Sequence, residues 1–213
     1  MINDEAKVLL GIGLITGVIF GIILIASNQS TQPAEPIATE VLVREDSWVK
    51  EAPNEEVTLV EFLDLECEAC RAAHPQIKQI LEEYGGQVTY VVRYFPLHQN
   101  SELAAKVAEA AGEQNKYWEM VDLLFERQEE WGEKKEPQTD LFRSYAEELG
   151  LDMAKFTAAL ENPAFEDKIA RDRRDGVDAG VSATPTVFLN GQIVDAFPTY
   201  NTLKGLIDVE LAD

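Results

Sequence analysis

The stretch Glu61–Pro75 reads EFLDLECEACRAAHP and holds both cysteines of the chain, Cys67 and Cys70. The run that leads into it, Val57–Leu63, is β-branched and apolar with no helical period, which is typical of a buried strand. After Cys67 the apolar residues follow helical spacing until a glycine pair at 85–86. The sequence therefore predicts that Cys67 lies where a strand ends and a helix begins.

This position favours thiol chemistry at the cysteine pair. Free backbone N–H groups and the positive end of a helix dipole stabilise a thiolate, so we expect the pKa of Cys67 to lie below the value of about 8.5 for a free thiol. Cys70 follows almost one helical turn later, within reach of a mixed disulfide formed by Cys67. We therefore interpret Cys67 as the nucleophile and Cys70 as the resolving thiol.

Three other interpretations of the pair are open at this point. A zinc site would need Cys67, Cys70, His74 and His98, but their spacing is far from that of zinc fingers. The cysteines could also be two idle buried thiols, or a structural clip whose ring is too short to constrain the unfolded chain strongly. The redox interpretation is favoured because the C-x-x-C spacing coincides with a strand-to-helix junction.

The rest of the chain predicts an α/β domain. A second strand over Val88–Phe95 follows the first helix, and a strand, helix, strand unit places its two strands in parallel. The stretch from Glu102 to about Asp178 is helical in pattern. Asn190 and Gly191 then predict a hairpin between strands at 186–189 and 192–196, and an amphipathic helix closes the chain.

Composition excludes some classes of function. The chain has 213 residues with 39 acidic and 18 basic side chains, a formal charge of −21. Such a surface repels nucleic acid, so we expect no nucleic-acid partner. Two cysteines three positions apart also leave no second pair for a framework of structural disulfides.

The amino-terminal part predicts a membrane anchor. Val8–Ala26 carries no charge and is long enough to cross roughly 30 Å of hydrocarbon. With Lys7 before it, residues 1–7 are predicted to be cytoplasmic and everything after Ala26 extracytoplasmic. A cleaved secretory signal is the competing interpretation. Residues 27–53 are predicted to be a linker and 54–213 the folded domain.

Five ordered motifs resemble a known family. They are LVEFLDLECEAC at 59–70, the helix proline Pro75, YFPLH at 94–98, YWEMVDLLFERQEEW at 117–131 and GVSATPTVFLNG at 180–191. Over about Val57–Leu211 the chain resembles DsbA-like thiol-disulfide oxidoreductases of the thioredoxin superfamily. The resemblance implies a thioredoxin-like α/β fold with a helical insertion, here at about 100–178.

The resemblance also implies roles for single residues. Pro185 matches the family's cis-proline, with Thr184 before it, in a loop that holds substrate backbone. Glu61 matches a buried acid that accepts a proton from the resolving thiol, whereas on an outer strand it would be an ordinary solvated glutamate. No metal or cofactor is implied beyond the Cys67–Cys70 disulfide.

The residues between the cysteines depart from the family pattern. Oxidants of this family often have a proline or histidine there, whereas this chain has Glu68 and Ala69. We expect Glu66 and Glu68 to raise the pKa of Cys67 and to make the disulfide less oxidising. His74, one turn beyond Cys70, is a candidate for partial compensation.

The expected function is oxidation of exported proteins at the cell membrane. Substrate thiols would reduce the pair, and the resemblance implies reoxidation by a membrane partner of the DsbB or vitamin K epoxide reductase type. A disulfide reductase or isomerase is the alternative among enzymes. A redox-inert peptide-binding chaperone is the alternative from another class.

Overall fold

The structure is a computed structural model that describes residues 36–212. The predicted cytoplasmic segment, the predicted membrane span over 8–26 and the first part of the predicted linker lie outside these residues. Within 36–212, no helix combines the length and the apolar character needed to cross a membrane.

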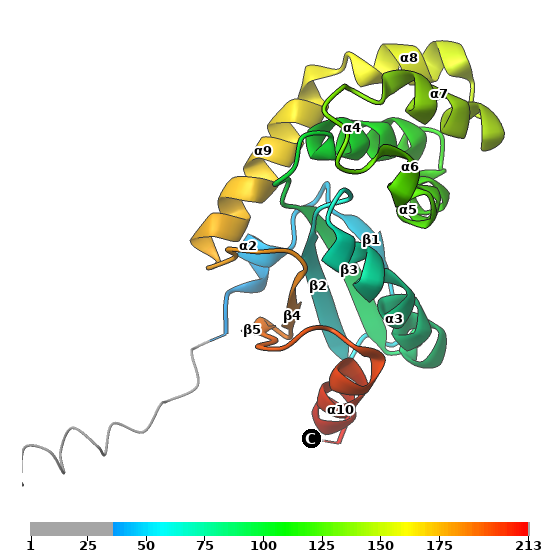
Figure 1. The fold of residues 1–213 in the computed structure, drawn as a ribbon. Helices are drawn as coiled ribbons and strands as arrows, with labels where there is room; N and C mark the ends of the chain where they lie inside the picture. Colours follow the sequence, from blue (N-terminus) through cyan, green and yellow to red (C-terminus); the bar gives the residue numbers. More distant parts are fainter. Residues whose placement is uncertain (1–35, 213) are drawn as a thin grey trace, which may run out of the picture. The chain divides into compact units, whose positions relative to one another are not determined.

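A five-stranded sheet forms the centre of the domain (Figure 1). Its strands are β1 (Trp48–Lys50), β2 (Val57–Leu63), β3 (Val88–Tyr94), β4 (Thr186–Leu189) and β5 (Gln192–Ile193), in the order β1-β3-β2-β4-β5. β2 and β3 run parallel, as predicted, and the other neighbours are antiparallel. β2 and β3 are the apolar runs of the sequence because strands in the middle of a sheet are covered on both faces.

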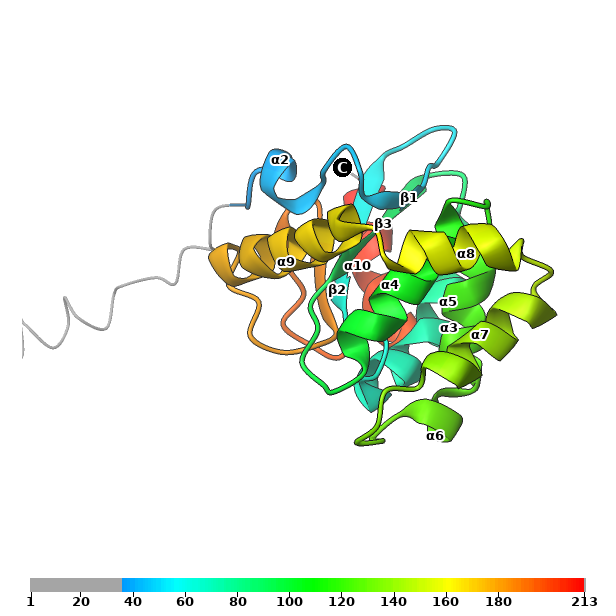
Figure 2. The same cartoon turned by 90° about the horizontal axis from the view of Figure 1, so that it is seen from above.

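Helices cover the two faces of the sheet (Figures 1 and 2). On one face lie α3 (Glu68–Tyr84) and α10 (Tyr200–Glu210), which contact each other. The other face packs against α2 (Thr39–Leu42) and the carboxyl end of α9 (Pro163–Asp178). The sheet thus has one apolar core on each face, and successive side chains of β2 point into one or the other. Leu59 faces α3 and Phe62 faces α9.

The chain between β3 and β4 is helical, as predicted. It contains α4 (Ser101–Gly112), α5 (Tyr117–Glu126), α6 (Gln128–Trp131), α7 (Thr139–Glu148), α8 (Met153–Leu160) and α9. Asn162 caps α9 by accepting a hydrogen bond from the backbone N–H of Ala164, and Pro163 opens that helix. Gly150, with a φ of 72°, lies between α7 and α8, and Asn162 lies between α8 and α9.

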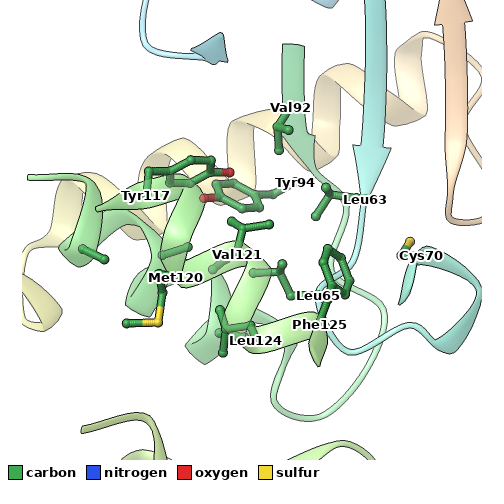
Figure 3. Packing of buried hydrophobic residues seen from close by; sticks show 14 of the residues in the cluster. Leu63, Leu65, Cys70, Val92, Tyr94, Tyr117, Met120, Val121, Leu124 and Phe125 are labelled. Atoms are coloured by element: carbon green, nitrogen blue, oxygen red, sulfur yellow. The ribbon is translucent and has the colours of Figure 1, made fainter. Parts of the chain in front are cut away.

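The helical insertion and the sheet share one apolar core. Figure 3 shows side chains of α5, among them Val121 and Phe125, directed toward Leu63 at the end of β2. Cys70 belongs to the same cluster, at its border with α3. The insertion is therefore packed directly behind the cysteine motif.

The predicted linker is too long, because its second part is folded. α2 and β1 lie within 27–53, and β1 pairs antiparallel with β3. The ring of Trp48 stacks on Tyr117 with centroids 4.1 Å apart, and its Nε1 donates to Glu109 at 2.7 Å. A three-residue strand has no recognisable period, and its partners lie far along the chain, so the sequence pattern does not reveal it.

The predicted hairpin forms at Asn190 and Gly191, whose φ angles are 46° and 80°. Both values suit the tight turn that an Asn-Gly pair favours. The second strand is shorter than predicted, since β5 contains only Gln192 and Ile193.

Candidate active site

The two cysteines lie at the start of α3, as predicted. Cys67 is the N-cap residue and is half-buried, whereas Cys70 is fully buried in the first turn. Asp64, in the preceding turn, contacts both: its carbonyl accepts from the N–H of Cys67 at 3.1 Å, and its N–H points at Cys70 Sγ at 3.5 Å. Both sulfurs are free thiols, so the structure represents the reduced pair.

The two thiols differ strongly in acidity. The pKa of Cys67 is lowered to about 5, and the largest cause is a hydrogen bond from the Cys70 thiol. Burial opposes this shift, whereas Thr184 and the backbone N–H groups of Ala69 and Cys70 add to it. The pKa of Cys70 is raised above its ordinary value, mainly because the sulfur is buried. Cys67 is therefore the thiolate of the pair and Cys70 remains protonated.

The charges expected from Glu66 and Glu68 do not decide the acidity of Cys67, because its pKa is lowered overall. Glu66 is buried, and its carboxylate accepts from the backbone N–H groups of Asn100 at 2.5 Å and Glu133 at 2.9 Å. Glu68 is exposed to solvent, which screens its charge. Hydrogen bonds made directly to the sulfur outweigh these two charges.

The predicted cis-proline is confirmed. The peptide bond between Thr184 and Pro185 is cis, and the Thr184 carbonyl oxygen lies 3.4 Å from Cys67 Sγ. Residues separated by 117 positions are thus brought together at the nucleophilic sulfur.

Glu61 lies on the central strand β2 and not on an outer strand. It is 1% exposed, faces the same core as α3, and accepts a hydrogen bond from the hydroxyl of Tyr90. Burial raises the pKa of Glu61 to about 7, although the bond from Tyr90 opposes this shift. The charge of Glu61 also contributes to the raised pKa of Cys70, so the two groups interact.

The two histidines bind different carboxylates. His74 Nε2 lies 2.7 Å from Asp122 on α5, so its role is to join two helices, and it has no contact with the thiols. His98 Nδ1 lies 2.6 Å from Asp64. Among residues 36–212 no group of three or more His, Cys, Asp or Glu side chains is placed to hold a metal, so the zinc alternative has no assembled site there.

Sequence reasoning missed Asp64 as part of the site and named His98 only as a possible zinc ligand. Asp64 is buried, and its carboxylate also accepts from the backbone N–H of Leu97 at 2.7 Å. Partial burial lowers the pKa of His98, but the hydrogen bond and charge of Asp64, with the charge of Cys67, raise it overall. The predicted parallel pairing of β2 and β3 was a signal for this contact, because both strands end at one edge of the sheet and the loops after them lie together.

Sequence reasoning also missed Gln128, whose side chain is 2% exposed. Its Nε2 donates to the carbonyl oxygens of Leu65 at 2.7 Å and Cys67 at 3.1 Å. A glutamine in a helical block carries no sequence signal for such a contact.

The sequence matches the model of a family described as Thioredoxin over residues 47–209. It is also similar to part of larger proteins: it is 36% identical to the Na(+)/H(+) antiporter NhaA of Herminiimonas arsenicoxydans over 137 residues, 64% of this chain and 21% of that protein. Na(+)/H(+) antiporter NhaA 3 of Salinispora tropica is 41% identical over 67% of this chain and 21% of its own length. The chain thus spans about a fifth of the length of these curated relatives.

Three solved structures have the same fold. A thioredoxin-like oxidoreductase from Silicibacter pomeroyi has a TM-score of 0.71 and 25% identity, covering 83% of this chain and 99% of its own. Alpha-DsbA1 from Wolbachia pipientis has a TM-score of 0.74 and 22% identity, and the match covers 83% of this chain and 96% of that chain. Oxidised BdbD from Bacillus subtilis has a TM-score of 0.70 and 20% identity, and the match covers 86% of this chain and 100% of that chain. The chain therefore belongs to the thioredoxin family and shares its fold with these three proteins.

Proposed function

We propose that this oxidoreductase introduces disulfides into exported proteins. The observation that carries the proposal is the placement of the two thiols, with Cys67 half-buried at the start of α3 and Cys70 fully buried behind it, which lowers the pKa of Cys67 to about 5 and raises that of Cys70. A thiolate this stable is a good leaving group, and it favours the reduced form of the pair. Such a pair gives its disulfide away, which is the property of an oxidant.

The reaction would proceed in two exchanges. A substrate thiolate attacks Cys67 Sγ of the disulfide, the Cys67–Cys70 bond breaks, and Cys70 leaves with the electron pair. A second substrate thiolate then attacks the substrate sulfur of the mixed disulfide, which forms the substrate disulfide and releases Cys67 as a thiolate. The substrate loses two electrons and the pair gains them.

Glu61 would manage the proton of the buried sulfur in this scheme. Cys70 leaves as a thiolate in an apolar site that favours the thiol, so it needs a proton. A carboxyl group with a pKa of about 7 is partly protonated near neutral pH and can give or accept this proton. In reoxidation the same group would take the proton back.

The loop at Thr184 and Pro185 would hold the substrate. Its backbone passes the nucleophilic sulfur at 3.4 Å, and an extended segment beside it would bring a substrate thiol to Cys67. Proline has no backbone N–H, so the Thr184 carbonyl and neighbouring polar groups would supply the contacts to the substrate backbone.

The uncharged run at 8–26 supports an anchored protein with its catalytic domain outside the cytoplasm. The reduced pair would then be reoxidised by a membrane partner of the DsbB or vitamin K epoxide reductase type. Thiol labelling of Cys67 in intact cells with a membrane-impermeant reagent tests this placement. Labelling only after lysis would contradict it.

The proposed activity is tested with a reduced, unfolded substrate protein that contains one pair of cysteines. Stoichiometric oxidised protein should convert the substrate to its disulfide form, and Cys67→Ser should abolish this conversion. Cys70→Ser should instead accumulate a mixed disulfide at Cys67. If Cys67→Ser assists the substrate as well as the unmodified chain does, the protein acts as a chaperone; if the reduced pair opens substrate disulfides instead, it acts as a reductase.

A further inference from the structure

A buried glutamine of the helical insertion bonds to the backbone of the cysteine motif. Gln128 is the first residue of α6, and its one amide nitrogen reaches the carbonyl oxygens of Leu65 and Cys67 at 2.7 and 3.1 Å. Both carbonyls belong to the turn that joins β2 to α3. A single side chain therefore spans the turn that presents the nucleophilic sulfur.

A second set of hydrogen bonds attaches the same turn to the same part of the insertion. Glu66 lies between the two carbonyl residues and accepts the backbone N–H of Glu133 at 2.9 Å. Glu133 has a φ of 57°, a conformation that residues with side chains seldom adopt. Asn100, whose N–H also bonds to Glu66, donates its side-chain amide to the carbonyl of Lys134 at 2.9 Å. Segment 128–134 thus holds the turn from both sides.

The orientation of this turn matters for the charge on Cys67. The backbone N–H groups of Ala69 and Cys70 help to lower the pKa of Cys67, and their direction relative to the sulfur depends on the N-cap conformation of Cys67, φ −73° and ψ 123°. Its carbonyl fixes the adjoining peptide plane, and that carbonyl accepts from the backbone N–H of Arg71 within α3 and from the side chain of Gln128, each at 3.1 Å. The amide also faces two oxygens whose partial negative charge would otherwise oppose a thiolate nearby.

We propose that Gln128 is a positioning residue that stabilises the Cys67 thiolate by bonding to the carbonyls of Leu65 and Cys67, and that it thereby raises the reduction potential of the pair. This inference rests on the proposed redox function of Cys67 and Cys70. It gives the helical insertion a direct part in the thiol chemistry.

The test compares three variants of the full chain. Gln128→Ala removes both donors, and Gln128→Glu keeps the size of the side chain but replaces the donor by a carboxylate. Gln114→Ala is the matched control, because Gln114 also joins insertion backbone, at the N–H and carbonyl of Asp152, but has no contact with the motif. The pKa of Cys67 is measured from thiolate absorbance, and the potential from equilibrium with glutathione.

Both Gln128 variants should raise the pKa of Cys67 by about one pH unit and make the disulfide less oxidising, whereas Gln114→Ala should change neither. If Gln128→Ala loses the native circular dichroism spectrum, Gln128→Glu decides, since it preserves the packing volume. Folded Gln128 variants with the original pKa and potential would overturn the inference and leave the proposed function intact. Failure of the unmodified chain to oxidise a substrate would overturn the proposed function. It would not affect the comparison of the Cys67 pKa between the Gln128 variants and the unmodified chain.

Discussion

At the scale of single residues, the acidity of Cys67 is decided by hydrogen bonds and not by the acidic residues beside it in sequence. Hydrogen bonding by Cys70 and by the backbone of the first turn of α3 lowers the pKa of Cys67, and a hydrogen bond to a charged group contributes about 1.5–3 kcal/mol. Glu68 acts through solvent, and its effect is correspondingly small. The departure from the family pattern between the cysteines therefore does not prevent an oxidising pair.

His98 is a source of positive charge near the pair, since the charge of Cys67 is one cause of its raised pKa. It is held by Asp64, which contacts both cysteines, and its raised pKa keeps it more protonated near neutral pH. We expect His98→Gln to raise the pKa of Cys67 by a few tenths of a unit, measured by thiolate absorbance. His74→Gln is the control, since His74 pairs with Asp122, and a larger shift in this control would contradict the assignment.

Glu61 should lower the stability of the reduced protein as pH rises. Its folded pKa of about 7 lies above its ordinary value near 4.5, so the folded state binds more protons than the unfolded state between these values and stability falls across that window. Glu61→Gln removes this titration. The free energy of unfolding of the variant, relative to that of the unmodified chain, should rise by about 3 kcal/mol as pH increases from 4.5 to 7. Above pH 7 this difference should stay constant.

Urea unfolding at several pH values measures this gain. Glu68→Gln provides a control because Glu68 is exposed, and it should show no comparable change with pH. A Glu61→Gln variant whose stability follows the same pH profile as the unmodified chain would show that Glu61 is ionised at its ordinary pKa.

Some site residues could be predicted from the sequence and others could not. Cys67, Cys70 and Pro185 belong to local motifs with a fixed relation to their strands, so their positions were recognisable. Asp64 and His98 were missed although the predicted parallel pairing of β2 and β3 brings their loops together, whereas the contacts of Gln128 depend on how α6 docks. Such contacts arise from tertiary packing, which periodicity does not encode.

At the scale of elements, a buried ion cluster joins β3 to α9. Arg93 is fully buried, and its guanidinium bonds to Asp172 at 2.8 Å and Asp175 at 2.5 Å. It also donates to the carbonyl of Leu42 in α2 at 2.7 Å. This arginine therefore connects three elements on the face of the sheet opposite α3.

Removing Arg93 should be strongly destabilising, because it leaves the buried carboxylate of Asp172 without its arginine partner and leaves Asp175 with Arg44 alone. We expect Arg93→Ala to cost about 3–5 kcal/mol in free energy of unfolding, measured with urea. Arg174→Ala, at an exposed position of α9, should change stability by less than about 0.5 kcal/mol. Equal losses in the two variants would mean that the buried cluster has no special role.

The strongly periodic elements were predictable, and the short ones were not. β2, β3, α3 and the insertion helices carry long apolar patterns, and the structure contains them. β1 and α2 have three and four residues, and they are ordered by partners such as Glu109 and Arg93 that lie far along the chain. Their stability comes from these contacts and not from intrinsic propensity.

At the scale of the whole domain, the redox state should control stability. The reduced folded protein gains from the Cys67 thiolate, and the disulfide form has no such titration. Because the folded pKa lies below the unfolded value, this gain is full above the unfolded pKa and is lost as pH falls through about 5. Near neutral pH we therefore expect the reduced form to melt at the higher temperature.

Thermal melts of both forms from pH 8 to pH 5 test this expectation. The difference in Tm, reduced minus oxidised, should decrease as pH falls. Cys67→Ser forms neither the thiolate nor the disulfide, so the Tm of this variant should lack the decrease with falling pH that the thiolate gives the reduced chain. A difference in Tm that stays constant with pH would contradict a thiolate as its source.

The central claim, that the pair is poised to oxidise, is tested most directly by its reduction potential. The purified full chain is equilibrated with glutathione buffers at neutral pH, and the fraction of Cys67–Cys70 disulfide is followed by thiol labelling. A potential closer to that of DsbA, about −120 mV, than to that of thioredoxin, about −270 mV, is the predicted result. A value at or below that of thioredoxin would contradict the account.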